Sequence, residues 1–283
     1  MTGTLYLCGT PIGNLEDMTF RAVRILKEVD LIAAEDTRNS RKLLNHFDIH
    51  TPMISYHEHN RQTRGRELVE KLQAGMDIAL ITDAGMPGIS DPGEDLAALA
   101  WDAGIPVTAV PGPAACITAL VLSGLPSRRF AFEAFLPQDK KERKEILGEL
   151  REEGRTIVLY EAPHRLLRTL EELREVLGGD RRISVCRELT KKHETVLQTT
   201  IAEACGYYQQ EAPRGECVLV IHGQSREDRR RESREAWMTL SLQEHMAYYT
   251  DQGVDRKEAM KLVAKDRGCS KREIYGQLLE QQK

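Results

Sequence analysis

Short apolar runs alternate with amphipathic stretches in the first part of this chain, and this order constrains the fold more than any other feature. Helical patterns such as Thr19–Val29 separate the runs. Strands that alternate with helices form parallel βαβ units. We therefore predict a doubly wound α/β domain over residues 1–123. Its strands are expected at Leu5–Cys8, Leu31–Ala34, Ile78–Ile81 and Val107–Val110.

The pattern changes near Gly124. The segment Phe130–Phe135 alternates aromatic with small or polar residues, as a half-exposed strand does. A second α/β domain is expected over residues 124–223. Its further strands are predicted at Thr156–Tyr160, Ile183–Cys186, Thr195–Gln198 and Cys217–His222, and its helices at Lys140–Glu152, Leu166–Leu177 and Ile201–Gln209.

The last part of the chain is predicted to be helical. Residues 224–234 are almost entirely charged or polar, so a linker is expected over residues 224–238 and a helical tail over residues 239–283. Ala264, Gly268 and Ile274 fall where a helix-turn-helix needs a small residue, a turn glycine and a buried aliphatic. This pattern suggests a tail that binds nucleic acid, and a plain helical hairpin fits nearly as well.

Composition argues against a membrane protein, a disulfide-rich protein and a zinc protein. The chain has 41% apolar and 30% charged residues, and no apolar stretch approaches the ~18 residues that span a bilayer. The first strand begins almost at Met1, so we expect a cytoplasmic protein. Six scattered cysteines indicate neither a disulfide framework nor a zinc site, and no metal is expected.

The net charge of −4 argues against nucleic acid as a partner, but its distribution qualifies that argument. Residues 225–283 hold thirteen Lys or Arg against eleven Asp or Glu. The rest of the chain therefore carries −6. Any polyanion contact is expected to depend on local patches and on the tail.

Three loops rich in glycine and proline follow predicted strands: Gly9–Asn14, Asp83–Gly93 and Val110–Pro113. Carboxyl ends of parallel strands meet at one edge of the sheet, where α/β folds bind ligands. Glycines allow close approach to the backbone, and prolines stiffen it. The spacing of Gly9 and Gly13 is wrong for a dinucleotide fingerprint, and no loop carries the Lys-Ser or Lys-Thr pair of a phosphate cradle. A ligand held by backbone groups and apolar contacts, such as S-adenosylmethionine, suits this edge.

Six motifs in order make the chain similar to the small-subunit ribosomal RNA methyltransferases of the tetrapyrrole methylase superfamily. They are Thr10–Leu15, Ala34–Arg38, Asp83–Gly93, Val110–Pro113, Tyr160–Arg165 and Arg187–Lys191. The resemblance implies methyl transfer from S-adenosylmethionine to the ribose 2′-hydroxyl of a decoding-centre cytidine in 16S rRNA. It also implies a homodimer, with the cofactor in the cleft between the two α/β domains.

The same resemblance places the cofactor contacts on the three loops and on the helix that follows the third. The expected contacts are Pro11, Gly13, Asp83, Gly85, Ile89, Ser90, Asp91, Pro111, Gly112 and Thr118. For Asp83 and Asp91 the alternative is loop capping, because Asp bonds its own backbone in turns.

Methyl transfer to a hydroxyl needs an in-line approach and a proton acceptor, and polar residues at strand ends supply candidates. These are Glu35, Asp36, Arg38, His57, Glu58, His59, Asn60, Glu161, His164, Arg165, Arg187, Glu188 and Lys191. The predicted catalytic residues are Glu35, Asp36, Arg38, Glu161, Arg187 and Glu188. Arginines here would hold RNA phosphates, and a carboxylate or histidine would accept the proton.

Structural alternatives stay open at several of these positions. Glu161 with Arg165 also fits a local ion pair, and Arg187 with Glu188 a pair across the domain. His57 and His59 point the same way if extended, but a metal site there lacks a third ligand. The sequence does not choose one base.

Other functions also remain possible at this point. One is methylation of a corrin or siroheme precursor within the same superfamily. Another is a non-catalytic ribosome-binding protein that docks through the tail. A nucleotide-binding dehydrogenase lacks the glycine fingerprint that it would need.

Overall fold

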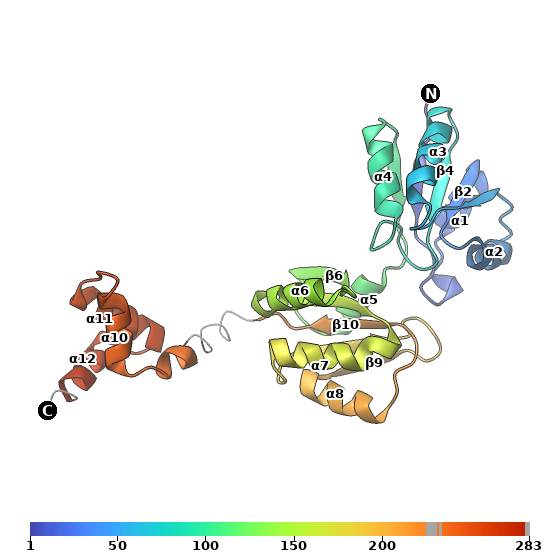
Figure 1. Cartoon of the computed structure of the whole chain (residues 1–283). Helices are drawn as coiled ribbons and strands as arrows, with labels where there is room; N and C mark the ends of the chain where they lie inside the picture. The colour runs from blue at the N-terminus through green and yellow to red at the C-terminus, as the bar shows by residue number, and fades with distance from the viewer. Residues whose placement is uncertain (225–230, 232–233, 281–283) are drawn as a thin grey trace. The chain divides into compact units, whose positions relative to one another are not determined.

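The computed structural model describes residues 1–224, 231 and 234–280, and these form two units (Figure 1). The larger unit spans residues 1–151 and 155–222 and contains two five-stranded sheets. The smaller unit contains residues 152–154 and the chain from 223 onward. Every helix in the described part of the chain is too short or too polar to span a membrane.

The first sheet is parallel, with strand order β3-β2-β4-β1-β5. Its strands are β1 (Leu5–Cys8), β2 (Leu31–Ala34), β3 (Met53–Ser55), β4 (Ile78–Ile81) and β5 (Val107–Val110). The helices that follow them are α1 (Phe20–Glu28), α2 (Thr37–His46), α3 (Arg61–Gln73), α4 (Gly93–Asp102) and α5 (Ala115–Leu122). The predicted doubly wound fold is confirmed, and β3 and α2 are elements that the sequence reading did not identify.

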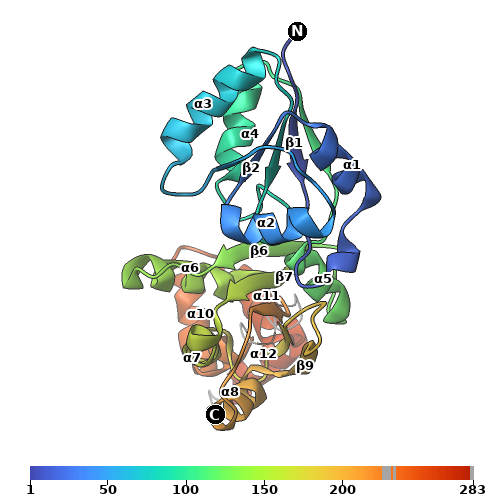
Figure 2. The same cartoon turned by 90° about the vertical axis from the view of Figure 1, so that its right-hand side faces the viewer.

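Alternate side chains of the buried strands enter two separate cores. Ile32 packs with residues of α1 and α2, whereas Leu31 packs with residues of α3 and α4. Figure 2 shows α1 on the opposite side of the sheet from α3 and α4. Strands buried on both faces are continuous apolar runs, as β2 and β4 are.

The second sheet is mixed, with strand order β6-β7-β10-β8-β9. Its strands are β6 (Phe130–Phe135), β7 (Thr156–Glu161), β8 (Arg182–Arg187), β9 (Thr195–Thr200) and β10 (Cys217–Ile221). One face packs against α6 (Lys140–Glu152), α7 (Leu166–Leu177) and α8 (Ile201–Gln210). The other face packs against α5. The predicted strands exist, and β7, β8 and β9 extend beyond their predicted ends by one or two residues.

Strand directions in the second sheet bring three carboxyl ends to one edge. Strands β6 and β7 are parallel, and both β7 and β8 pair antiparallel with β10. Strands β6, β7 and β8 therefore all point the same way. The segments after Phe135, Glu161 and Arg187 lie along that edge.

Three helices form most of the smaller unit: α10 (Leu242–Thr250), α11 (Arg256–Arg267) and α12 (Lys271–Glu280). They bury an apolar cluster that includes Met246, Val263 and Ile274. Gly268 adopts φ +65° at the end of α11, which is the left-handed conformation that a tight turn requires. The small residue Ala264, the turn glycine and the buried Ile274 thus occupy the positions expected of a helix-turn-helix.

Part of the predicted linker is structured. Residues 225–230 and 232–233 lie outside the described residues, but residues 234–238 are helical. The ring of Trp237 stacks on His245 at a centroid distance of 4.1 Å. The structure therefore differs from the sequence reading, because this part of the stretch packs on the helical tail.

Candidate active site

The three glycine- and proline-rich loops meet at the carboxyl edge of the first sheet. Thr10 and Gly85 exchange backbone hydrogen bonds of 2.9 and 3.1 Å, which join the first loop to the second. A Cβ on Gly9 would lie 2.7 Å from the Cα of Gly112, so the first and third loops are in backbone contact. The prediction that these loops share one edge is confirmed.

The loop at residues 83–93 has an unusual backbone that its own side chains stabilise. Gly85 and Gly88 have φ of +88° and +83°, and Ser90 has φ of +63°. Glycine adopts such angles freely, whereas Ser90 is strained there, and strained non-glycine residues cluster at functional sites. The carboxylate of Asp91 accepts hydrogen bonds from the amides of Gly88, Ile89 and Gly93 at 2.7–3.1 Å. Asp91 therefore caps its own loop, which is the alternative to a cofactor contact that the sequence left open.

The chemistry of these loops fits S-adenosylmethionine better than a phosphate-bearing cofactor. Residues 9–14, 83–93 and 110–114 contain no Lys or Arg, but they contain the carboxylates Asp83 and Asp91. Ile89, Ser90 and Pro111 are exposed, and Pro11 and Gly112 are half-buried. Thr118 uses its hydroxyl to donate to the carbonyl of Ala114 at 3.0 Å. An edge with exposed backbone, apolar groups and acidic groups suits an adenine and a sulfonium.

The second domain approaches this edge at Gly13. A Cβ on Gly13 would lie 2.4 Å from Cγ of Lys191 and 2.9 Å from the carbonyl oxygen of Leu189. Ile12 and Leu189 share one buried cluster. The loop after β8 is strained, with φ of +50° at Glu188 and +64° at Thr190. The buried hydroxyl of Thr190 has no hydrogen-bond partner in the described part of the chain.

Glu35 and Asp83 lie together at the ends of β2 and β4. The amide of Asp83 donates to Oε2 of Glu35 at 3.3 Å, and the amide of Asp36 donates to Oδ1 of Asp83 at 3.2 Å. Asn39 donates to the other oxygen of Asp83. Burial raises the pKa of Glu35, and the charges of Asp83 and Asp91 act in the same direction. A carboxylate with a raised pKa is a stronger proton acceptor.

Asp36 and Arg38 form a local pair. Asp36 is the N-cap of α2, and its carboxylate accepts from the amide of Arg38 at 2.8 Å. The Arg38 guanidinium also donates to both carboxylate oxygens. These hydrogen bonds lower the pKa of Asp36 to about 2. An acid with such a low pKa is a poor proton acceptor near neutral pH, so the contacts favour a structural role for Asp36.

Glu161 is buried at the end of β7. Its side chain is 1% exposed and lies 2.9 Å from Nε of Arg165, so the local ion pair that the sequence suggested is present. Thr169 donates to Oε2 at 2.6 Å, and the amide of Ala162 donates to Oε1 at 2.8 Å. His164 beside it is exposed. These contacts leave Glu161 enclosed by its own domain.

Arg187 and Glu188 do not pair with each other. Arg187 donates to the carbonyl of Arg214 at 3.1 Å, while Glu188 accepts from Lys191 at 3.0 Å and from the amide of Glu216 at 3.2 Å. Partial burial opposes ionisation of Glu188, but the ammonium of Lys191 outweighs it and lowers the pKa of Glu188. Glu188 therefore fixes the loop that reaches Gly13.

The two histidines after β3 lie side by side. The rings of His57 and His59 are 5.9 Å apart, and Asn60 donates to Nε2 of His57 at 3.3 Å. Glu58 pairs with Arg61 instead. In the part of the chain that the structure describes, no group of three His, Cys, Asp or Glu could hold a metal ion.

Three residues near the candidate site were not among the predicted site residues: Asn39, Phe135 and Tyr160, the last of which the sequence placed only in a motif. The hydroxyl of Tyr160 accepts from the amide of Cys116 at 3.2 Å and so joins β7 to the first turn of α5. Phe135 is 49% exposed at the end of β6. An aromatic residue that ends a strand and does not enter a core is the signal that would have identified Phe135.

Comparisons with known proteins agree with this geometry. Residues 4–205 match the model of the family Tetrapyrrole (Corrin/Porphyrin) Methylases. The chain is 50% identical over 274 residues to Ribosomal RNA small subunit methyltransferase I of Halalkalibacterium halodurans, and the match covers 96% of this chain and 93% of the relative. The protein of the same name from Synechocystis is 49% identical, with 98% of each chain covered.

Solved structures show the same fold at low identity. Uroporphyrin-III-C-methyltransferase from Thermus thermophilus has a TM-score of 0.54 and 21% identity, over 77% of this chain and 94% of that chain. A diphthine synthase has a TM-score of 0.62 and 12% identity, over 77% of this chain and 89% of that chain.

Proposed function

The chain belongs to the tetrapyrrole methylase family, and from that premise we propose that it methylates ribosomal RNA of the small subunit with S-adenosylmethionine as donor. The acceptor in this proposal is the ribose 2′-hydroxyl of a decoding-centre cytidine in 16S rRNA. The observation that carries it is the junction of the three loops at Thr10, Gly85 and Gly112, with Glu35 beside them. Relatives at 42–50% identity over nearly the whole chain carry the rRNA methyltransferase name.

The three loops form the cofactor site of this proposal. Bound S-adenosylmethionine supplies an electrophilic methyl group on a positively charged sulfur. The backbone of Gly85 and Gly112 lines the site, and Ile89 offers an apolar side chain that is 37% exposed. The carboxylate of Asp83 contributes negative charge. Pro11, Gly13, Ser90, Pro111 and Thr118 stay predicted contacts.

Glu35 is the proposed proton acceptor. It lies at the end of β2, and its oxygen already accepts from the amide of Asp83. A general base typically contributes ~10²–10⁴-fold to the rate, while positioning contributes up to ~7–11 kcal/mol. Orientation of the ribose by the second domain is therefore expected to matter more than the base.

The helical tail is the proposed RNA-binding module. Arg272 and Tyr275 are exposed on α12, with Lys271 at its start. Basic and aromatic side chains on one helix suit phosphate and base contacts. A homodimer is proposed as well, since α5 exposes the apolar side chains of Ile117, Val121 and Leu122.

The deciding experiment is transfer of a labelled methyl group to small ribosomal subunits from a strain that lacks this enzyme. We expect one labelled ribose, located by mass spectrometry of RNA fragments. Label on a base, or at another ribose, would show that the proposed acceptor is wrong. If no methyl group is transferred either to naked RNA or to subunits, the proposed methyltransferase activity is refuted.

Tetrapyrrole methylation is the second candidate, because the fold is shared with uroporphyrin-III-C-methyltransferase. The identity to that protein is only 21%, against 50% to the rRNA methyltransferase of Halalkalibacterium halodurans. A parallel reaction with uroporphyrinogen III separates the two. Transfer to the tetrapyrrole and none to RNA would favour this second candidate.

A further inference from the structure

The buried carboxylate of Glu161 holds an arginine in place at the edge of the second sheet. Glu161 lies 2.9 Å from Nε of Arg165, although the N–H does not point along a hydrogen bond, so the contact is an ion pair. A buried carboxylate is costly unless it is paired and hydrogen-bonded. The ion pair, together with the hydrogen bonds from Thr169 and Ala162, meets that requirement.

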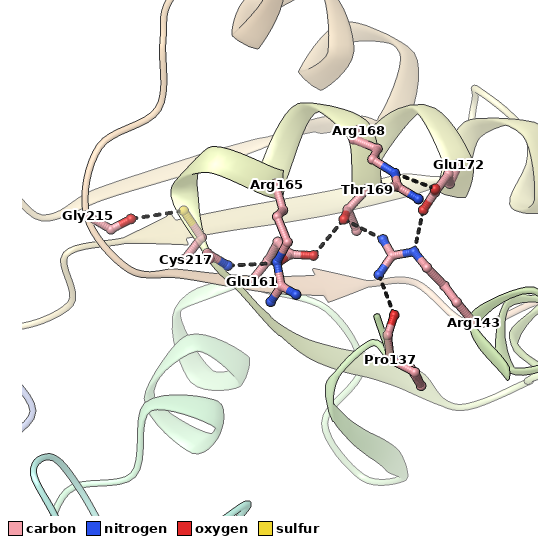
Figure 3. Close-up of polar contacts among 10 residues, drawn as sticks. Pro137, Arg143, Glu161, Arg165, Arg168, Thr169, Glu172, Gly215 and Cys217 are labelled. Atoms are coloured by element: carbon pink, nitrogen blue, oxygen red, sulfur yellow. Dashed lines mark hydrogen bonds and ion pairs between the residues drawn. The ribbon is translucent and has the colours of Figure 1, made fainter. Parts of the chain in front are cut away.

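A chain of polar contacts fixes this carboxylate from behind. Thr169 lies between Glu161 and Arg143, with oxygen distances of 2.6 Å to the carboxylate and 2.7 Å to the guanidinium. Arg143 also pairs with Glu172 at 2.6 Å, and its side chain is only 7% exposed. Figure 3 shows this series of contacts from α6 through α7 to the end of β7. The position of Arg165 is thus determined by packed elements.

Arg165 keeps hydrogen-bond donors available for a ligand, although it is ion-paired with Glu161. In the described part of the chain, its guanidinium makes no hydrogen bond, and its side chain is 25% exposed. Figure 3 shows the side chain extending from the start of α7 past the Glu161 carboxylate. The guanidinium carbon lies 5.9 Å from the centroid of the Phe135 ring. The terminal amino groups therefore keep donors for a ligand.

Phe135 and Tyr160 complete the cluster. Phe135 is 49% exposed, and its ring centroid lies 5.5 Å from that of Tyr160. The Tyr160 hydroxyl bonds the first turn of α5, directly after the third cofactor loop. The carboxyl edge that carries Phe135 and Arg165 is also the edge whose β8 loop contacts Gly13. The cluster therefore lies on the same edge as the proposed cofactor site.

We propose that Arg165 and Phe135 bind a nucleotide of the RNA substrate, with Arg165 on a backbone phosphate and Phe135 against an unstacked base. Glu161 is then a positioning residue that acts through Arg165. This inference rests on the proposed function. Arginine binds phosphates through a planar fork of donors, and aromatic rings stack on bases of single-stranded RNA.

The test compares full-length variants in RNA binding and in methyl transfer to small subunits. Arg165→Ala is expected to raise the KM for subunits about tenfold or more, as expected for a charged hydrogen bond. It is also expected to lower the salt slope of RNA binding by ~0.7, the value for one single-strand phosphate. Phe135→Ala is expected to weaken RNA binding at least about fivefold, because the base can no longer stack on the ring. The affinity for S-adenosylmethionine should stay within twofold in both variants.

Matched variants separate binding from folding. Arg168→Ala removes an arginine three residues away, inside α7, whose side chain is 62% exposed, and its KM should stay within twofold of the wild-type value. Arg165→Lys keeps the charge without the fork and should restore the salt slope but only part of the affinity. Glu161→Gln should raise KM as Arg165→Ala does, and calorimetric unfolding identifies any loss of fold.

Two kinds of failure are distinguishable. Wild-type protein that transfers no methyl group to RNA overturns the proposed function, and this inference with it. Wild-type transfer combined with an unchanged KM and salt slope in Arg165→Ala overturns the inference alone. Equal losses in Arg165→Ala and Arg168→Ala would also overturn it, because the effect would then be general charge.

Discussion

At the residue scale, Glu35 is the carboxylate whose surroundings best suit proton transfer. Glu35→Gln should lower kcat by about 10²–10⁴-fold, the usual contribution of a general base, and leave affinity for S-adenosylmethionine unchanged. Because burial raises the pKa of Glu35 above the ordinary 4.5, wild-type activity should rise with pH through a midpoint above that value. Rate measurements between pH 4.5 and 8 test both statements.

The control for this prediction is Glu28→Gln, which makes the same change at a side chain that is 56% exposed on α1. It should not alter kcat or the pH profile. A Glu35→Gln variant with a normal rate and the same acid limb would remove Glu35 from the mechanism.

The backbone contact of Gly9 with Gly112 leaves no room for a side chain at Gly9. A Cβ on Gly9 would lie 2.7 Å from backbone and from Sδ of Met86, so Gly9→Ala must separate the loops. We expect a loss of about 1–3 kcal/mol in the free energy of unfolding, as for other overpacked sites. Weaker binding of S-adenosylmethionine should accompany it, and calorimetry measures both.

Gly148→Ala is the matched control for the glycine prediction. Gly148 lies inside α6, and beyond its neighbours and the backbone of that helix no heavy atom of the described residues lies within 4 Å of its Cβ position. Alanine should stabilise the protein there by roughly 0.4–1 kcal/mol, chiefly by restricting the unfolded chain. If both variants changed stability in the same direction, close packing of Gly9 would not explain its effect.

At the element scale, local signals predicted more than contacts between distant segments did. Strands β2 and β4 are continuous apolar runs, and the loops after β1, β4 and β5 are marked by glycine and proline. Strand β3 is only three half-buried residues, and α2 buries only Ser40 and Leu44, so neither gives a strong periodic signal. Short and polar elements are recognised mainly by what they pack on.

In the candidate site too, contacts between residues close in sequence were predicted, and contacts between distant residues were not. The ion pair of Glu161 with Arg165 joins residues only four positions apart, and the sequence suggested it. The approach of Asp83 to Glu35 joins residues 48 positions apart and depends on the pairing of β2 with β4. Likewise, Arg143 reaches Thr169 only because α6 packs beside α7 on the second sheet. Such contacts follow from tertiary packing, which periodicity does not encode.

The helical tail contains a buried histidine that makes its stability dependent on pH. Burial lowers the pKa of His245 below the ordinary 6.5. Arg267 donates to Nδ1 of His245 at 3.1 Å, so the neutral ring that donates from Nε2 to Asp266 fits this site. The folded state therefore prefers the neutral form. The contribution of neutral His245 to the free energy of unfolding should be complete above pH 6.5. It should decrease as the pH falls through the pKa of His245 in the folded state.

Trp237 reports on this site because its ring stacks on His245. The chain has two tryptophans, so a Trp101→Phe background leaves Trp237 as the single probe. Urea unfolding followed by its fluorescence should show lower stability at pH 5.5 than at pH 7.5. His245→Gln should reduce that difference. Equal dependence on pH in both proteins would assign it to other groups.

At the scale of the whole molecule, the exposed face of α5 is the proposed contact between two copies. Val121 is 73% exposed, although it lies on a helix that is apolar nearly throughout. Val121→Glu should shift the mass in light scattering from dimer to monomer, because an unpaired charge in an apolar interface is costly. Phe20→Glu, at a side chain that is 97% exposed on α1, is the comparison. A monomeric wild-type protein would refute the homodimer.

RNA binding by the helical tail is the other property of the whole molecule, and its electrostatic part is measurable without removing any segment. Neutralising Lys271 and Arg272 together should weaken binding to small subunits. It should also lower the salt slope by ~0.7–0.9 for each phosphate that these side chains no longer neutralise. The affinity for S-adenosylmethionine should not change, because the predicted cofactor contacts all lie in the larger unit. Lys261→Ala, which removes a side chain paired with Glu258, is the control. An equal change in that control would mean that the tail adds only diffuse charge, whereas no change in the double variant would assign RNA binding to the larger unit alone.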